Sequence, residues 1–254
     1  MASETIYDHP RYYDILFGFD RSQEVEFYDR TFSRRGVARG ERVLELACGP
    51  ARVARLLARR GYRVTGLDHR PAMLAFARDE AAREAIPLAT LCADMTEFAS
   101  EEKFAAACNP LSSFRLLHRD AEADAHLRCV AAALRPGGVY VLDLGFQASV
   151  GEPVVTTDAG WEMTRGEVTV RGENDAVTVD DAGLRLRLAW GPGAHLRGYT
   201  ATAFAERVGA CPDLEIESWH PEAGRATGVS EFHLAPAAGP PTVGRAMVVL
   251  RRRC

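Results

Sequence analysis

The stretch VLELACGPARVARLL, residues 43–57, decides the fold of this chain. A run of apolar residues passes into a turn of small residues, and apolar residues at helical spacing follow that turn. This order predicts a strand, a tight turn and a helix. Turns of this kind usually hold nucleotide-like cofactors and usually carry three glycines. Here Gly49 is the only glycine and Ala47 and Ala51 flank it, so the first question is whether the loop still binds a cofactor.

Strand and helix patterns alternate from this stretch to about residue 144. Alternation of this kind predicts βαβ units, a mostly parallel sheet and helices on both faces. Residues before the first strand also have a helical pattern, and we expect Asp120 to cap the last helix of this part. The expected strands are 42–47, 63–68, 87–95, 103–108 and 139–144, and the expected helices lie within 6–35, 51–60, 71–85 and 120–138.

The pattern changes after residue 150. Between residues 166 and 190 apolar and polar residues alternate, which is typical of half-exposed antiparallel strands. A helix is then expected from Thr200, its N-cap, to about Val208, and residues 214–220 and 243–252 read as two closing strands. We therefore expect an α/β fold with a seven-stranded, mostly parallel sheet and an inserted antiparallel lid.

Composition limits the classes of function. The chain has 254 residues, 47% of them apolar and 26% charged, with a net charge of −4 and a pI of about 6.0. These values predict a globular protein with no broad attraction for nucleic acid. The six cysteines form no CxxC pair, and neither a signal peptide nor a long apolar run is visible. We expect a cytoplasmic protein that does not enter the membrane.

Acidic residues lie near the ends of the first three expected strands. They are Glu45, Asp68 and Asp94, the last followed by Met95. Because the carboxyl ends of parallel strands meet at one edge of a sheet, these side chains should face one site. Asp68 has the spacing of an acidic residue that binds ribose hydroxyls. Alanine methyls in the loop and the negative Glu45 disfavour a pyrophosphate there, since a dinucleotide needs glycine for close backbone approach.

A cofactor with a ribose, a base and a cationic amino-acid tail, but no phosphate, suits such a loop. S-adenosylmethionine (SAM), whose demethylated product is S-adenosylhomocysteine, has this chemistry. On these residues the sequence resembles the class I SAM-dependent methyltransferases. Its ELACGPA, residues 45–51, is similar to the first motif of that family, and LRPGGVYVLDL, residues 134–144, is similar to a later helix–turn–strand segment.

The resemblance implies a Rossmann-like core and a set of cofactor contacts. It places Asp68 on the ribose, Met73 and Asp94–Met95 near the adenine, and Tyr13 of YYDILFG, residues 12–18, over the methionine end. His69 either leans on the adenine or faces solvent. The predicted cofactor-binding residues are Tyr13, Glu45, Ala47, Gly49, Asp68, His69, Met73, Asp94, Met95 and Asn109. In domain terms, residues 1–150 and 200–254 form the core with an N-terminal helical cap, and residues 151–199 form the substrate lid.

The implied reaction is in-line methyl transfer to an amine or hydroxyl of a small molecule such as a sugar amine, an amino acid or a secondary metabolite. Orientation of the acceptor is the main demand of such a displacement, and a base is needed only for a protonated nucleophile. His118 is the candidate general base, with a capping or surface histidine as the alternative. Asn109-Pro110-Leu111-Ser112 lacks the aromatic residue of enzymes that methylate base or glutamine amines. No metal is expected, because no acidic residue accompanies Asp143 near Asn109.

Three other functions stay open at this level. The chain is also compatible with a methyltransferase acting on nucleic acid or protein, although its acidic charge disfavours nucleic acid. It is compatible with a non-catalytic SAM-binding protein, since two loop glycines are lost. An enzyme of the same fold that catalyses a different reaction, such as a cyclisation, is the third. A homodimer is also left open.

Overall fold

The computed structural model describes residues 4–149, 160–173, 176–191, 195–226 and 229–254. Its main sheet has eight strands in the order β11-β10-β12-β5-β4-β1-β2-β3. The strands are β1 Arg42–Leu46, β2 Arg63–Asp68, β3 Ala89–Cys92, β4 Phe104–Asn109, β5 Leu134–Phe146, β10 Leu214–Ala226, β11 Val229–Phe232 and β12 Gly244–Arg252.

The sheet is parallel across β3, β2, β1, β4 and β5. Strand β12 then inserts antiparallel between β5 and β10, so the two closing strands form the predicted antiparallel pair. The strand order reverses between β1 and β4, which opens a ligand-binding edge at the carboxyl ends of those strands. The predicted seven-stranded α/β sheet is confirmed, and the short β11 extends it by one antiparallel strand.

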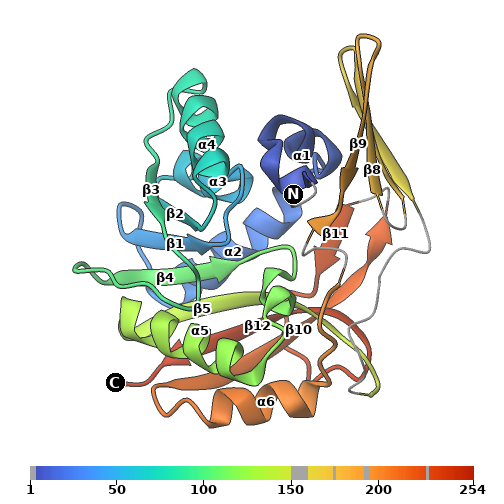
Figure 1. Ribbon diagram of the computed structural model, residues 1–254. Helices are drawn as coiled ribbons and strands as arrows, with labels where there is room; N and C mark the ends of the chain where they lie inside the picture. The colour runs from blue at the N-terminus through green and yellow to red at the C-terminus, as the bar shows by residue number, and fades with distance from the viewer. Residues whose placement is uncertain (1–3, 150–159, 174–175, 192–194, 227–228) are drawn as a thin grey trace.

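Helices cover both faces of the main sheet (Figure 1). One hydrophobic core contains Leu57, Leu74 and Phe27, and the other contains Leu127 and Phe204. Successive residues of a strand point to opposite faces, so β1, β2, β4, β5 and β12 contribute to both cores. The first face carries α2 Ser22–Arg34, α3 Arg52–Arg59 and α4 Pro71–Arg83, and the second carries α5 Asp120–Ala133 and α6 Ala201–Gly209.

Some predicted boundaries are confirmed and two are wrong. Thr200 caps α6, since its side chain accepts a hydrogen bond from the backbone of Ala203. Asp120, in contrast, is the first residue of α5, and Arg119 occupies the N-cap position. Helix α5 also ends at Ala133 rather than at residue 138, because Leu134 already pairs with β4. The next pair is Ala106 with Val139, so the segment between these pairs bulges out of the register.

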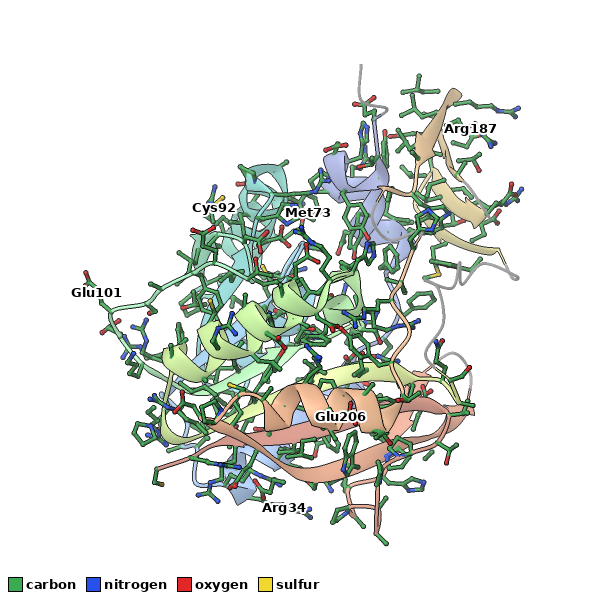
Figure 2. All side chains as sticks on the ribbon, turned by 60° about the horizontal axis from the view of Figure 1, so that its bottom comes forward. Arg34, Met73, Cys92, Glu101, Arg187 and Glu206 are labelled. Atoms are coloured by element: carbon green, nitrogen blue, oxygen red, sulfur yellow. The ribbon has the colours of Figure 1, made fainter. Side chains whose placement is uncertain are left out.

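A second sheet stands apart from the main one and carries the predicted antiparallel strands. Its order is β6-β7-β8-β9, with all neighbours antiparallel. Arg187, labelled in Figure 2, belongs to β9, an edge strand of this sheet. The predicted start of the inserted lid at residue 151 lies outside the described residues. The strands are β6 Trp161–Arg165, β7 Val168–Glu173, β8 Ala176–Asp181 and β9 Leu184–Ala189.

The N-terminal elements pack against this second sheet. They are the short 3-10 helix η1 Ile6–Asp8 and the helix α1 Pro10–Leu16. Ile6 and Leu16 share a third hydrophobic core with Val170, Val177 and Leu188 of the second sheet. Segments more than 140 residues apart in the sequence therefore form one small body, here called the cap layer (residues 5–17, 161–173 and 176–190), which lies beside α4 in Figure 1.

None of the helices in the described ranges is both long and apolar enough to cross a membrane.

Candidate active site

A cavity of about 370 Å³ lies between the main sheet and the cap layer. Its floor is formed by residues that follow β1, β2, β3 and β4, which is the predicted ligand edge. Its roof is formed by η1, α1 and the second sheet. The lining residues are Tyr7, Tyr13, Phe17, Ala47, Gly49, Leu67, Asp68, His69, Arg70, Met73, Asp94, Met95, Thr96, Leu111, Ser112, Ser113, Leu116, Leu117, Glu122, Trp161, Trp190 and Leu196.

The loop after β1 has the backbone of a three-glycine loop although two of its residues are alanine. Ala47, Gly49 and Ala51 all have left-handed conformations, with φ of 52°, 51° and 55°. This conformation costs an L-residue other than glycine about 1–2 kcal/mol. A Cβ added at Gly49 would lie 3.7 Å from Tyr13. That distance is an ordinary contact, so what glycine relieves at this position is the left-handed conformation, and the fold sustains strain at the other two.

Asp68 connects this loop to the next one. Its Oδ2 accepts a hydrogen bond from the backbone N–H of Gly49 at 2.8 Å, and its Oδ1 accepts one from the N–H of Arg70 at 2.9 Å. Only 7% of Asp68 is exposed, and what remains accessible faces the cavity. A carboxylate has about four acceptor positions, so two remain for ligand hydroxyls. Asp68 therefore both shapes the site and can bind a ribose.

Glu45 does not line the main cavity but is bound to the helix that follows the loop. It is buried, and its Oε2 accepts a hydrogen bond from the N–H of Ala54 in the first turn of α3 at 2.6 Å. Burial raises the pKa of Glu45 to about 8, against the opposing effect of the Ala54 hydrogen bond. Its side chain borders a second cavity of about 30 Å³ that lies beside the loop and shares Tyr13 and Ala47 with the main cavity.

Arg21 also borders this second cavity, and the sequence analysis did not identify it. It immediately precedes α2 and is 7% exposed. Its Nη1 donates to Glu24 at 3.1 Å, whereas its Nη2 is buried and has no hydrogen-bond partner within the described residues. An unpaired buried donor is costly unless a ligand satisfies it, so this position suits an anionic group. The only sequence signal was an arginine close to the aromatic YYDILFG segment.

The opposite end of the cavity contains the residues predicted for the adenine. Asp94 accepts hydrogen bonds from the N–H and the hydroxyl of Thr96 at 2.7 and 2.6 Å. Burial raises its pKa, but these hydrogen bonds outweigh burial and hold the pKa below the usual value. Met73 is buried on α4 and lies toward the N-terminal helices in Figure 2. The side chain of His69 is 61% exposed, which agrees with its solvent-facing alternative.

Besides Glu45, two predicted residues do not line the main cavity. Asn109 is buried, donates to the carbonyl of Leu46 at 3.1 Å and accepts from the N–H of Phe114 at 2.9 Å. His118 is exposed, and its Nε2 is 2.8 Å from the carbonyl oxygen of His195. Asn109 therefore fixes the turn after β4, and His118 holds the segment that returns from the second sheet.

The turn after β4 carries strain at the cavity wall. Leu111 and Ser112 are both left-handed, with φ of 58° and 54°. The N–H of Ser112 donates to Oδ2 of Asp143 at 3.2 Å, and Arg245 donates to Oδ1 of the same carboxylate at 2.7 Å. Asp143 is fully buried in this ion pair. Strained turns of this kind are typical of functional sites, where the surrounding contacts hold them.

Comparison with known proteins relates this site to a described family model. Residues 43–138 match the family model described as a methyltransferase domain. This match covers the loop, Asp68, Asp94–Met95 and the turn after β4. Those residues are therefore similar in sequence to a methyltransferase domain.

Solved structures match over nearly the whole chain. A SAM-dependent methyltransferase from Clostridium acetobutylicum is 16% identical, with a TM-score of 0.73, and the match covers 96% of this chain and 97% of that one. A sugar N-methyltransferase from Streptoalloteichus is 22% identical, with a TM-score of 0.64 and coverage of 100% and 95%. The SAM-bound amino pentose methyltransferase of calicheamicin biosynthesis from Micromonospora echinaspora is 23% identical, with a TM-score of 0.61 and coverage of 92% of each chain.

No curated protein sequence matches the chain. At these identities the solved structures establish the fold, which is that of the class I SAM-dependent methyltransferases. The fold implied by the resemblance found in the sequence is thereby confirmed.

Proposed function

We propose that this protein transfers a methyl group from SAM to an amine or hydroxyl of a small molecule, with an amine favoured. One observation carries the proposal: a single cavity joins the loop of residues 47–51, Asp68 and Asp94–Met95 to a roof made by the cap layer. The floor has the residues for a nucleoside with an amino-acid tail. The roof adds the aromatic side chains of Tyr7, Phe17 and Trp161.

The residues present fit SAM. Asp68 offers free acceptor positions for the ribose hydroxyls, and Asp94 offers a carboxylate near the base. The unpaired Nη2 of Arg21 suits the carboxylate of the amino-acid tail. Gly49 takes its left-handed conformation without strain beside Tyr13. When bound, SAM supplies an electrophilic methyl group.

The chain's own residues orient the acceptor and keep water out. Orientation of two reactants can contribute about 7–11 kcal/mol to such a step. Tyr7 in the roof is not suited to remove a proton: burial raises its pKa to about 12, against the opposing effect of Arg70, so its phenol stays protonated. A neutral amine needs no base before it attacks. This is the reason for favouring an amine over a hydroxyl.

The solved relatives support this assignment. Two of them are described as methyltransferases of sugar amines or sugar nitrogens. The net charge of −4 opposes a nucleic-acid acceptor, since phosphate contacts require a basic surface. We infer a small-molecule acceptor and a cytoplasmic enzyme.

The test is titration calorimetry with SAM and S-adenosylhomocysteine, followed by methyl-transfer assays with small amines and alcohols. We expect micromolar binding of both nucleosides and turnover with at least one amine. Binding without turnover across the panel would favour the non-catalytic SAM-binding alternative. Absence of binding would show that the two alanines close the loop.

A further inference from the structure

We propose that the acceptor of this enzyme presents a flat aromatic ring to a wall formed by Phe17, Trp161 and Trp190, here called the aromatic wall. The inference rests on the proposed function, because it assumes that the floor of the cavity holds SAM. It names the chemical class of the second substrate, which neither the fold nor the relatives determine.

The aromatic wall lies at the end of the cavity away from the nucleoside residues. Trp161 begins β6 and Trp190 directly follows β9, whereas Met73 belongs to α4. Helix α1 stands between α4 and the second sheet in both Figure 1 and Figure 2. A molecule against the aromatic wall is therefore a neighbour of the cofactor and not a part of it.

The three rings pack against each other at right-angled or tilted geometry. The Phe17 centroid lies 5.7 Å from that of Trp161 and 6.3 Å from that of Trp190, with interplanar angles of 68° in both cases. The two indoles lie 5.3 Å apart at 39°. Tyr13 extends the row, 4.5 Å from Phe17. Such arrays accept another ring by edge-to-face or offset stacking.

The polar atoms of the aromatic wall are already used by the backbone. The indole N–H of Trp161 donates to the carbonyl of Leu16 at 2.9 Å, and that of Trp190 donates to the carbonyl of Glu173 at 2.6 Å. The rings therefore offer carbon surface to the cavity and no free donor. The aromatic wall offers no hydrogen-bond partner to the hydroxyls of a sugar, whereas an aromatic ring needs none to stack there.

The aromatic wall also carries no charged side chain. The charged or titrating side chains that line the cavity, apart from tyrosine, are all on the main domain: Asp68, His69, Arg70, Asp94 and Glu122. The cap layer contributes Tyr7, Tyr13, Phe17, Trp161 and Trp190. Nη1 of Arg165 in β6 donates a hydrogen bond to Oδ2 of Asp14 at 2.7 Å. No described lining residue of the cap layer is thus an ionised partner for a charged acceptor.

The backbone of Gly172 in β7 packs against the Trp190 ring and fixes its position. A Cβ added at Gly172 would lie 2.6 and 2.8 Å from two carbons of the Trp190 ring. The indole therefore lies directly on the glycine backbone, which holds it at the cavity edge. Substitution of Gly172 by alanine displaces the ring without removing any aromatic group.

The experiment measures binding of two probes to protein saturated with S-adenosylhomocysteine. The aromatic probe is 2-phenylethylamine and the sugar probe is glucosamine, each followed by calorimetry and by tryptophan fluorescence. We expect roughly tenfold tighter binding of 2-phenylethylamine, together with a change in tryptophan emission. Trp161→Leu and Gly172→Ala should each weaken the aromatic probe several-fold while leaving binding of S-adenosylhomocysteine unchanged.

Trp219 provides the matched control, because it is the third tryptophan of the chain and packs against Phe146 and Phe204 in the main core. Trp219→Phe should leave binding of the aromatic probe and its fluorescence change intact. Equal or tighter binding of glucosamine, or unchanged binding of the aromatic probe by both wall variants, would overturn the inference. The proposed function would survive either result, whereas failure of S-adenosylhomocysteine to bind the wild-type protein would overturn both.

Discussion

The backbone N–H of Gly49 donates to Oδ2 of Asp68 at 2.8 Å, across 19 residues of sequence. The end of β2 thus holds the loop that follows β1. The same carboxylate accepts from the N–H of Arg70 at the start of α4. One side chain therefore shapes two loops of the candidate site and still faces the cavity.

Substitution of Asp68 should weaken both the cofactor site and the fold. We expect Asp68→Ala to reduce SAM affinity by about 1–3 kcal/mol, because ribose hydroxyls lose their acceptor, and to lower stability by a similar amount. Calorimetry and urea unfolding measure the two effects. Asp79→Ala, at an exposed position of α4, is the control and should change neither. An unchanged dissociation constant in Asp68→Ala would remove this residue from the cofactor site.

Ala47→Gly should stabilise the protein or leave its stability unchanged. Ala47 has a φ of 52°, and glycine relieves about 1–2 kcal/mol of strain there, offset by about 0.4–1 kcal/mol of extra entropy in the unfolded chain. Ala75→Gly, in the exposed middle of α4, should instead cost about 1 kcal/mol. Chemical denaturation compares the two. Similar destabilisation in both variants would argue against a left-handed Ala47.

Arg21→Met should weaken binding of S-adenosylhomocysteine by about 10–100-fold, because the charged hydrogen bond to the ligand carboxylate is lost. Binding of 5′-methylthioadenosine, which has no amino-acid tail, should change little. Calorimetry with both ligands therefore separates loss of a contact from general damage to the site. Equal losses for the two ligands would assign Arg21 to the scaffold.

Acid should destabilise the fold through His126. Burial lowers the pKa of His126 to about 4, against opposing contributions from the Met95 carbonyl and Asp94. In the unfolded chain the pKa is about 6.5, so the unfolded state binds more protons between these values. His126 makes its full contribution to the free energy of unfolding above pH about 6.5. As much as about 3 kcal/mol of that free energy is lost as the pH falls to about 4.

Urea unfolding at several pH values checks this linkage. His126→Gln should flatten the slope of stability against pH in the window from about 4 to 6.5. His69→Gln, at an exposed histidine, is the control and should keep the wild-type slope. A wild-type slope in the His126 variant would mean that other groups cause the acid sensitivity.

His118→Ala distinguishes the two roles considered for this residue. A general base predicts a turnover about 100-fold lower or more. The hydrogen bond from Nε2 to the His195 carbonyl predicts near-normal turnover with a stability loss of about 1 kcal/mol. We expect the second result, since His118 does not line the cavity. Steady-state kinetics beside urea unfolding will show which role holds.

Local sequence patterns were sufficient to predict most of the helices and strands of the fold. Short apolar periods predict strands β1, β2 and β4 and helices α3 and α4, because each of these elements buries one face or both. The alternation between residues 166 and 190 likewise indicated β7, β8 and β9. The acidic residues at the strand ends indicated the ligand edge, because parallel strands place their carboxyl ends together.

Contacts between distant segments decided the remainder. The sequence by itself determined a sheet of alternating strands and helices and a cofactor loop built around Gly49. Only the tertiary structure decided that Ala47 takes a left-handed conformation, that Arg21 keeps a buried unpaired donor, and that the N-terminal helices share a core with β6–β9. Periodicity reports which face of an element is buried, but not which distant residue covers it, because that partner is chosen when the whole chain packs.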